Sequence, residues 1–333
     1  MKNKGSKILY NLIKILIFLI RLIPSRLALR LSAASGRIVG KFCKEEIAIA
    51  KAQLQLLCNV KKTKVEIAPI ISANFAHIGK TVYESLIIDR LTEFKDGIQV
   101  AKSFSEQPYK YIEFLNDTKV LDQILENDSS CIILSAHLGC FELLAACAAK
   151  FEVNQTKRKL IAIGRNPNFS VADLILKDIR ETYGMQTIWR NDPHVGVKLA
   201  QLIKQRNWLA VLIDQDINLK NQFYPFLGLP AAYPVVPIRL AVKYSIPTVS
   251  AFIVRQDAFK YLVSVKPIKY DSQKETAVTQ ILSAYTQHLE SLLLEYPEQW
   301  VWWHRRWRRR PEGGKIRTTA EYLKWLKTIQ DNL

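Results

Sequence analysis

The sequence predicts an α/β protein: a mixed β-sheet flanked by helices, with a helical N-terminal layer and an N-terminal membrane-anchoring helix. From Cys131 onward, short apolar runs of strand length alternate with segments of helix length, which indicates a sheet with helices on its faces. Before that point, apolar residues recur mainly at helical spacing. No internal repeat and no Gly- or Pro-rich linker interrupts the 333 residues. We therefore expect one domain behind the anchor.

Residues 1–24 predict the anchor. The run 8–23 is mainly apolar, is interrupted by Asn11, Lys14 and Arg21, and ends before a proline. It is short for a spanning helix, which needs about 20 apolar residues, and no small-residue cleavage site follows it closely. An uncleaved anchor fits best, either as a marginal span or as a helix in the membrane interface with basic residues against lipid phosphates. Packing on the protein's own core is the alternative.

The remaining chain, 25–333, divides into a mostly helical layer at 25–130, an α/β core at 131–312 and a C-terminal helix at 313–333. Short apolar runs predict strands at 131–135, 159–163, 186–189, 208–213, 247–254 and 261–267. Helical spacing predicts helices at 141–150, 169–183, 194–206, 234–245 and 274–296. We expect the aromatic segment 223–228 to form a loop. Three alternatives remain open for it: lining an acyl-chain channel, touching lipid or packing in the core.

Charge and cysteine content restrict the partners. Lys and Arg number 48 against 30 Asp and Glu, a formal charge of +18, which predicts an anionic partner such as nucleic acid, an anionic membrane surface, or an acidic substrate or carrier protein. The five cysteines show no C-x-x-C pair and no metal-ligand spacing. We expect free thiols in a reducing compartment, and no metal or cofactor.

The stretch 131–150 holds the first candidate site. His137 and Glu142 are five residues apart, and on one continuous helix they would lie about 140° apart, on different faces. The segment His137-Leu138-Gly139 supplies a turn between a strand and a helix. A base and a carboxylate would then share a strand end beside a helix N-terminus, where open α/β sheets place ligands.

Two acidic residues follow another predicted strand. Asp214 and Asp216 stand at the end of the strand 208–213. Carboxylates at this edge of a sheet can bind a metal, orient a base or hydrogen-bond sugar hydroxyls. Capping of a loop is the structural alternative.

A basic rim is expected at the same edge. Arg165 and Asn168 follow the strand 159–163, and Arg180 lies in a predicted helix. Because a guanidinium binds phosphate or carboxylate through two parallel hydrogen bonds, these residues suit an anionic substrate. Surface arginines in a turn are the alternative.

Near the C-terminus, residues 300–310 interleave four tryptophans with arginines. This pattern is typical of a membrane interface, where the rings lie at headgroup depth and the guanidiniums meet phosphates. It also suits single-stranded nucleic acid.

Five short motifs in order resemble one family. They are His137-Leu138-Gly139-Cys140-Phe141-Glu142, Arg165-Asn166-Pro167, Asp214-Gln215-Asp216, Pro225-Phe226-Leu227-Gly228, and Trp303-His304-Arg305-Arg306 closing on Arg310-Pro311. The chain resembles the bacterial lipid A late acyltransferases, which add secondary acyl chains to the lipopolysaccharide precursor. The resemblance implies an acyltransferase domain over 25–333, in an inner-membrane protein active on the cytoplasmic face. It also implies an acyl-carrier-protein thioester as donor and a lipid A precursor as acceptor.

Transfer from a thioester to an alcohol requires the hydroxyl to lose its proton, a task that suits a neutral imidazole near pH 7. We expect His137 to be the general base and Glu142 to hydrogen-bond its other ring nitrogen. Backbone N–H groups at the start of helix 141–150 would hold the oxyanion.

Binding roles complete the hypothesis. The basic rim (Arg165, Asn168 and Arg180) would hold the anionic headgroup, and Asp214 and Asp216 would orient the acceptor or that rim. The basic surface would meet two acidic partners, the carrier protein and anionic membrane lipids.

Two other functions are compatible with parts of the sequence. Acyltransferases for other glycolipids share the core motif, whereas those for lysophospholipids use His-x-x-x-x-Asp, so Glu142 argues against the second group. A membrane-tethered nucleic-acid binder would use residues 300–310, but it leaves His137 and Glu142 without a role. We therefore expect no nucleic acid partner.

Overall fold

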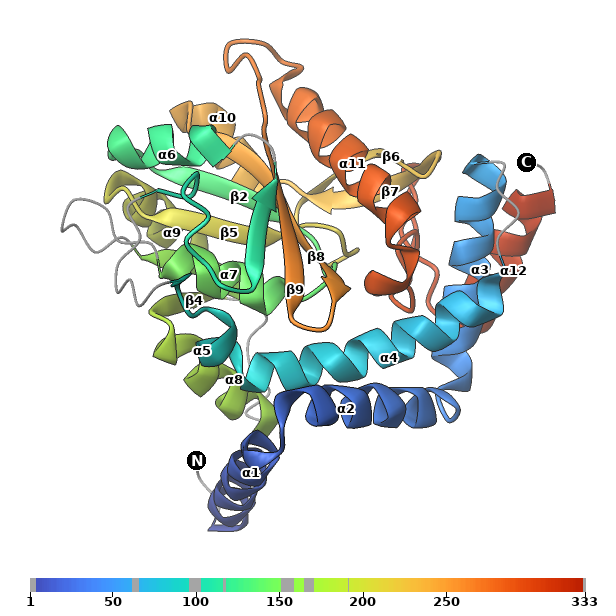
Figure 1. Cartoon of the computed structure of the whole chain (residues 1–333). Helices are drawn as coiled ribbons and strands as arrows, with labels where there is room; N and C mark the ends of the chain where they lie inside the picture. Colours follow the sequence, from blue (N-terminus) through green and yellow to red (C-terminus); the bar gives the residue numbers. More distant parts are fainter. Residues whose placement is uncertain are drawn as a thin grey trace.

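The computed structural model describes residues 4–61, 66–95, 103–115, 118–150, 159–164, 171–190 and 192–331. Its centre is a seven-stranded mixed sheet with the order β1-β9-β8-β2-β5-β3-β4 (Figure 1). The strands are β1 (Ile112–Leu115), β2 (Cys131–Ser135), β3 (Leu160–Gly164), β4 (Met185–Trp189), β5 (Trp208–Leu212), β8 (Thr248–Asp257) and β9 (Lys260–Pro267). Among the described strands of this sheet, only β8 and β9 pair in the antiparallel direction. The carboxyl ends of β2, β3, β4, β5 and β8 therefore meet at one edge.

Helices cover both faces of this sheet. They are α6 (Thr118–Glu126), α7 (Phe141–Ala149), α8 (Val171–Thr182), α9 (Val195–Lys204), α10 (Val236–Tyr244) and α11 (Ala277–Glu295). Alternate side chains of a strand point to opposite faces. Ile132 and Leu134 of β2 pack with α9, α10 and α11, whereas Ile133 packs with α6 and α7. The predicted strands and helices of this part are confirmed, with ends that differ by at most three residues.

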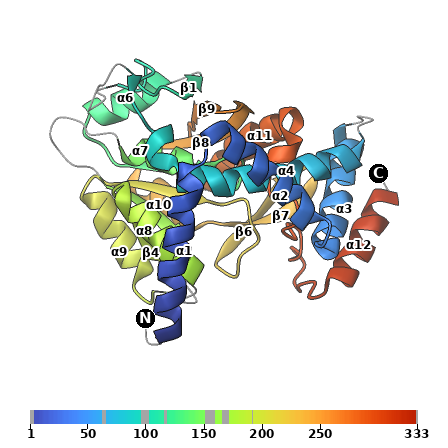
Figure 2. The same ribbon diagram turned by 60° about the horizontal axis from the view of Figure 1, so that its bottom comes forward.

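A helical layer lies beside the sheet. It consists of α1 (Lys4–Leu22), α2 (Ser25–Gly40), α3 (Lys44–Lys61), α4 (Ile67–Leu86) and the short α5 (Ile88–Leu91), and the C-terminal α12 (Thr319–Asp331) packs on α3. Figure 2 shows α1 running beside α8, with its N-terminal end at the bottom of the view. Across the described ranges, no helix has the length and apolar character needed to cross a membrane.

Two glycines bring α2 and α4 into backbone contact. A Cβ added to Gly36 would lie 2.2 Å from the carbonyl oxygen of Phe75, and one added to Gly79 would lie 2.0 Å from that of Ser32. No larger side chain fits at either position, so the two helices form one rigid pair.

The aromatic segment 223–228 is part of a β-hairpin and does not form the expected loop. Strands β6 (Asn221–Phe226) and β7 (Leu229–Pro234) pair in the antiparallel direction. The connecting Leu227 and Gly228 both have positive φ, 50° and 79°, as a two-residue turn matched to the strand twist requires. Phe226 and Leu227 are fully buried. Of the open alternatives, the structure supports packing in the core for these two residues, whereas Phe223 and Tyr224 are half-buried and Pro225 is exposed.

Four residues of the tryptophan–arginine segment 300–310 are buried and the other seven are half-buried, so the interfacial interpretation is wrong for the buried four. Three of its tryptophans are at most 1% exposed: Trp300, Trp302 and Trp307. Arg306 is 1% exposed, and its guanidinium lies 4.3 Å from the ring centroid of Tyr233. These side chains close the core and cannot insert into lipid or stack on bases.

Candidate active site

A tight turn, residues 136–140, joins β2 to α7. Gly139 has φ of 62°, and a Cβ there would lie 1.8 Å from the carbonyl oxygen of Ile253. Its N–H donates to the carbonyl oxygen of Gln299 at 2.9 Å. Only glycine fits this conformation and this approach. The turn is therefore held on two sides, and His137 leaves it at the carboxyl edge of the sheet.

Strand register brings His137 next to Asp214. In the parallel pair β2–β5, Ser135 lies opposite Leu212, so the residues two positions further on also lie level. His137 Nδ1 is 2.9 Å from Asp214 Oδ1, and the His137 backbone N–H donates to Asp214 Oδ2 at 3.0 Å. Trp300 Nε1–H donates to the same Oδ2 at 2.8 Å.

Asp214 carries the negative charge of the His137–Asp214 pair. Burial raises the pKa of this 1% exposed carboxyl, but the charge of His137 and the hydrogen bonds from His137 and Trp300 outweigh burial and hold the pKa at about 2. A carboxylate accepts hydrogen bonds, so Nδ1 carries the proton and Nε2 is left as the basic nitrogen. The His137 side chain is 25% exposed, and within the described residues no hydrogen bond engages Nε2.

Glu142 faces a different partner. Arg180 Nε donates to Glu142 Oε2 at 3.0 Å, and Arg180 Nη2 donates to Oε1. The expected hydrogen bond between Glu142 and His137 is therefore corrected: the ring nitrogen is held by Asp214, and both Glu142 oxygens are held by Arg180. The reason is that α7 starts beyond the turn and directs Glu142 toward α8.

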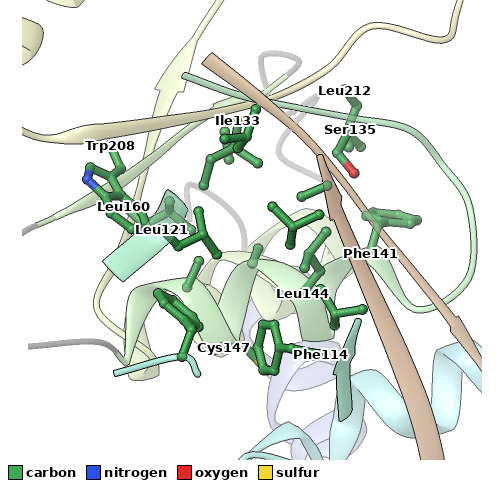
Figure 3. A pocket seen from close by; sticks show the side chains of 18 residues that line it. Phe114, Leu121, Ile133, Ser135, Phe141, Leu144, Cys147, Leu160, Trp208 and Leu212 are labelled. Atoms are coloured by element: carbon green, nitrogen blue, oxygen red, sulfur yellow. The ribbon is translucent and has the colours of Figure 1, made fainter. Parts of the chain in front are cut away.

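An apolar cavity of about 50 Å³ lies between α7 and the sheet (Figure 3). Alternate strand residues line it because they share one face: Ile133 and Ser135, Ala210 and Leu212, Val249 and Ala251, and Val263 and Val265. Phe141 also lines it, and the ring centroid of Phe141 is 5.1 Å from that of His137. Ser135 Oγ is buried at the wall and has no hydrogen-bond partner in the part of the chain that the structure describes.

A model of a known family, described as bacterial lipid A biosynthesis acyltransferase, matches residues 4–309. The chain belongs to this family. The match covers most of the sequence and confirms the resemblance drawn from the five motifs. A search of curated proteins finds no match. The protein is thus an acyltransferase of the lipid A biosynthesis type.

The other predicted site residues of this acyltransferase have different positions. Arg165 and Asn168 lie outside the described residues, directly after β3. Asp216 is fully buried and binds the C-terminal segment: Arg309 Nε lies 2.6 Å from its Oδ1, and the Arg309 backbone N–H lies 3.0 Å from its Oδ2. The structure therefore brings together His137 with Asp214, and Glu142 with Arg180, but it directs Asp216 away from them.

Sequence reasoning missed Trp300 and Gln299, which hold Asp214 and Gly139. Both belong to the segment around the short helix η2 (Pro297–Gln299), and Leu138 forms a β-bridge with Trp300. The available signal for the His137–Asp214 pair was that each residue closely follows the end of a predicted strand. No comparable signal identifies Trp300, since 86 residues separate it from its carboxylate partner.

A buried polar cluster, which we call the His77 network, packs against the turn 136–140. It contains His77, Glu84, Arg255 and Tyr261. Arg255 Nε donates to Glu84 Oε1 at 2.6 Å, and Tyr261 Oη–H donates to the same oxygen at 2.6 Å. Burial first, then the charge of Arg255, lowers the pKa of His77 well below its usual value, against a backbone hydrogen bond at Gly139 that raises it. The network therefore reaches the turn that carries His137.

Proposed function

We propose that the protein transfers a fatty acyl group from an acyl-carrier-protein thioester to a hydroxyl of a lipid A precursor at a membrane surface. One observation carries the proposal: His137 has one ring nitrogen fixed by a buried carboxylate and the other without a partner among the described residues, next to Phe141 at the wall of an apolar cavity. The family match supports the reaction class.

In the proposed reaction, Asp214 keeps the proton on Nδ1 of His137 and stabilises the imidazolium that forms. Nε2 accepts the proton of the acceptor hydroxyl while that oxygen attacks the thioester carbonyl carbon. Collapse of the tetrahedral intermediate breaks the carbon–sulfur bond, and His137 returns the proton to the departing thiolate. The products are an ester and the carrier-protein thiol.

The oxyanion would lie at the N-terminus of α7. Backbone N–H groups in the first turn of a helix have no carbonyl four residues earlier to bind, and the helix dipole favours negative charge there. Cys140, at the N-cap, is fully buried, and burial raises the pKa of its thiol well above the usual value. A covalent route through this thiol is therefore disfavoured.

The apolar cavity is where we place the first carbons of the acyl chain. Its volume of about 50 Å³ is well below the roughly 150 Å³ of an engineered cavity that admits benzene. Aromatic side chains at its wall, Phe141 among them, must therefore move for a long chain to enter.

Arg180 would bind the anionic headgroup. A guanidinium has five N–H donors, and Glu142 uses two of them, so the remaining donors can reach a phosphate. We assign Glu142 the task of orienting Arg180. Arg165 and Asn168, which follow β3, complete this rim in the proposal.

Membrane contact would involve α1. One set of its apolar side chains is at least 49% exposed: Ile8, Leu9, Leu12, Ile15, Leu16, Phe18, Leu19 and Leu22. A helix with such a surface suits the membrane interface. Its other side is tied down, because Tyr10 hydrogen-bonds Asp178 and Arg21 pairs with Asp89.

Purified protein given an acyl-carrier-protein thioester and a lipid A precursor should yield the acylated glycolipid, measured by mass spectrometry. His137→Ala should lower the transfer rate roughly 10²- to 10⁴-fold, because the base is lost. His194→Ala, an exposed histidine at the start of α9, is the matched control and should leave the rate unchanged. Lysophospholipid as the preferred acceptor, or full activity of His137→Ala, would refute the proposal.

A further inference from the structure

A basic hollow lies between α2, α4 and the turn that joins β8 to β9. It has a volume of about 470 Å³. Its lining includes four cations, Arg26, Arg30, Arg37 and Lys80, and one carboxylate, Asp257. Within the described part of the chain, none of the four cations forms an ion pair or a side-chain hydrogen bond. The hollow therefore carries an excess of positive charge that the protein does not neutralise.

The helical spacing of α2 aligns its three arginines. At about 100° per residue, Arg26, Arg30 and Arg37 fall within about 40° of one another. The neighbouring stripe, about 100° further round the helix, is apolar. It holds Leu27, Leu31 and Ile38, each at least 49% exposed. Basic and apolar stripes thus run side by side on the outside of α2.

An apolar hollow of about 640 Å³ adjoins the basic one. Arg37 lines both, so its long side chain marks their boundary. Isoleucines, alanines and a phenylalanine supply most of the lining of the second hollow: Ala34, Ile38, Ile47, Ile67, Ala68, Ile71 and Phe75. The Gly36 and Gly79 contacts fix α2 against α4, so both hollows have a rigid floor.

Neighbouring cations also affect Lys80. Burial lowers the pKa of this ammonium, and the charges of Arg255 and Arg37 lower it further, against Glu84 and Asp257, which raise it. A bound anion would relieve this repulsion.

We propose that the two hollows form a binding site for an anionic phospholipid of the membrane, with the phosphodiester in the basic hollow and an acyl chain in the apolar hollow. The site lies apart from His137 and binds a lipid that is not consumed. The proposal rests on the membrane-surface part of the proposed function.

The shape of the site favours a lipid over the acidic carrier protein. A carrier protein would offer carboxylates on a helix, which fit a flat basic surface. Here a basic hollow and an apolar hollow share one arginine, and exposed leucines flank them. This arrangement matches a molecule with a charged head and an apolar tail.

The test is flotation of the full-length protein with phosphatidylcholine vesicles that contain or lack phosphatidylglycerol. Arg30→Gln/Arg37→Gln should lower the affinity for phosphatidylglycerol vesicles roughly 30-fold, at about fivefold per cation near a membrane surface. Lys204→Gln/Lys327→Gln removes the same charge from two exposed lysines on α9 and α12 and should lower it far less. Asp257→Asn removes the single carboxylate of the hollow and should raise the affinity about fivefold.

Equal losses in the two double variants would overturn the proposal in favour of general surface attraction. Loss of carrier-protein affinity in Arg30→Gln/Arg37→Gln, with vesicle affinity unchanged, would assign the hollow to the carrier protein. Acyl transfer in detergent micelles tests the proposed function separately. It should be the same in wild type and in the hollow variants, whereas a wild type inactive in micelles would refute the enzyme proposal and leave the vesicle result standing.

Discussion

Two histidines of this protein lie beside charged partners at the same turn, yet only one is arranged to act as a base. His77 has both ring nitrogens engaged: Arg255 Nη1 lies 2.7 Å from Nδ1, and Thr81 Oγ1 lies 3.3 Å from Nε2. It is 6% exposed. Among the described residues, His137 has only Nδ1 engaged, by Asp214, and its ring packs on Phe141, which lines a cavity.

The difference shows that hydrogen-bond partners around the ring do not by themselves arrange a histidine as a base. A base needs one nitrogen fixed and the other accessible to substrate. His288 follows the His77 pattern, since Ser250 Oγ and Ser264 Oγ lie 2.8 and 2.9 Å from its two nitrogens. The His77 network therefore stabilises the turn, and the His137–Asp214 pair performs the chemistry in our proposal.

The largest expected effect comes from a substitution that breaks the His137–Asp214 pair but keeps the shape of the Asp214 side chain. Asp214→Asn should lower kcat roughly 10³- to 10⁴-fold, because an amide can donate to Nδ1 and favour the wrong tautomer. Circular dichroism should still report a folded protein. Asp216→Asn is the matched control: it lies at the same strand end but binds Arg309, so it should reduce stability and leave kcat within about threefold. Similar kcat losses in both variants would contradict the assignment.

Breaking the His77 network should act on stability first. Glu84→Gln leaves the guanidinium of Arg255 buried without a counter-charge, a change that costs about 3–5 kcal/mol. Urea denaturation measures the loss. Glu84→Gln/Arg255→Met, which removes both charges, should recover much of it. A loss below about 1 kcal/mol in the single variant would mean that the ion pair does not support the turn.

Lowering the pH should further distinguish the His137–Asp214 pair from the His77 network. The folded pKa of Asp214, about 2, lies below its ordinary value of 3.8. A depressed carboxyl pKa stabilises the fold above the unfolded pKa, and this contribution is lost as pH falls through the folded pKa. We therefore expect about 2 kcal/mol to disappear between about pH 4 and pH 2. Asp214→Asn should flatten this part of the stability profile, and an unchanged profile would contradict the pairing.

Sequence reasoning predicted the sheet, most helices and the strand-end positions of His137 and Asp214, because local periodicity determines them. It paired His137 with the wrong carboxylate. Glu142 is nearer to His137 in sequence, but Asp214 contacts His137 because β2 and β5 are neighbours in the sheet. The order of strands in a sheet cannot be predicted from local sequence patterns. Residues 300–310 were misread for a related reason: their composition suits an interface, whereas their burial depends on contacts such as Trp300 with Asp214.

The smallest expected effect tests whether Ser135 only lines the cavity or also takes part in the reaction. Ser135 Oγ has no hydrogen-bond partner among the described residues, so Ser135→Ala removes an unsatisfied buried hydroxyl and should raise stability by up to about 1 kcal/mol with transfer unchanged. Ser250→Ala is the contrasting control, because it deletes a hydroxyl that His288 uses and should lower stability by about 1 kcal/mol. A tenfold loss of kcat/KM in Ser135→Ala, at unchanged stability, would instead make this hydroxyl a donor to the thioester carbonyl. The chemistry would then extend from His137 into the cavity wall.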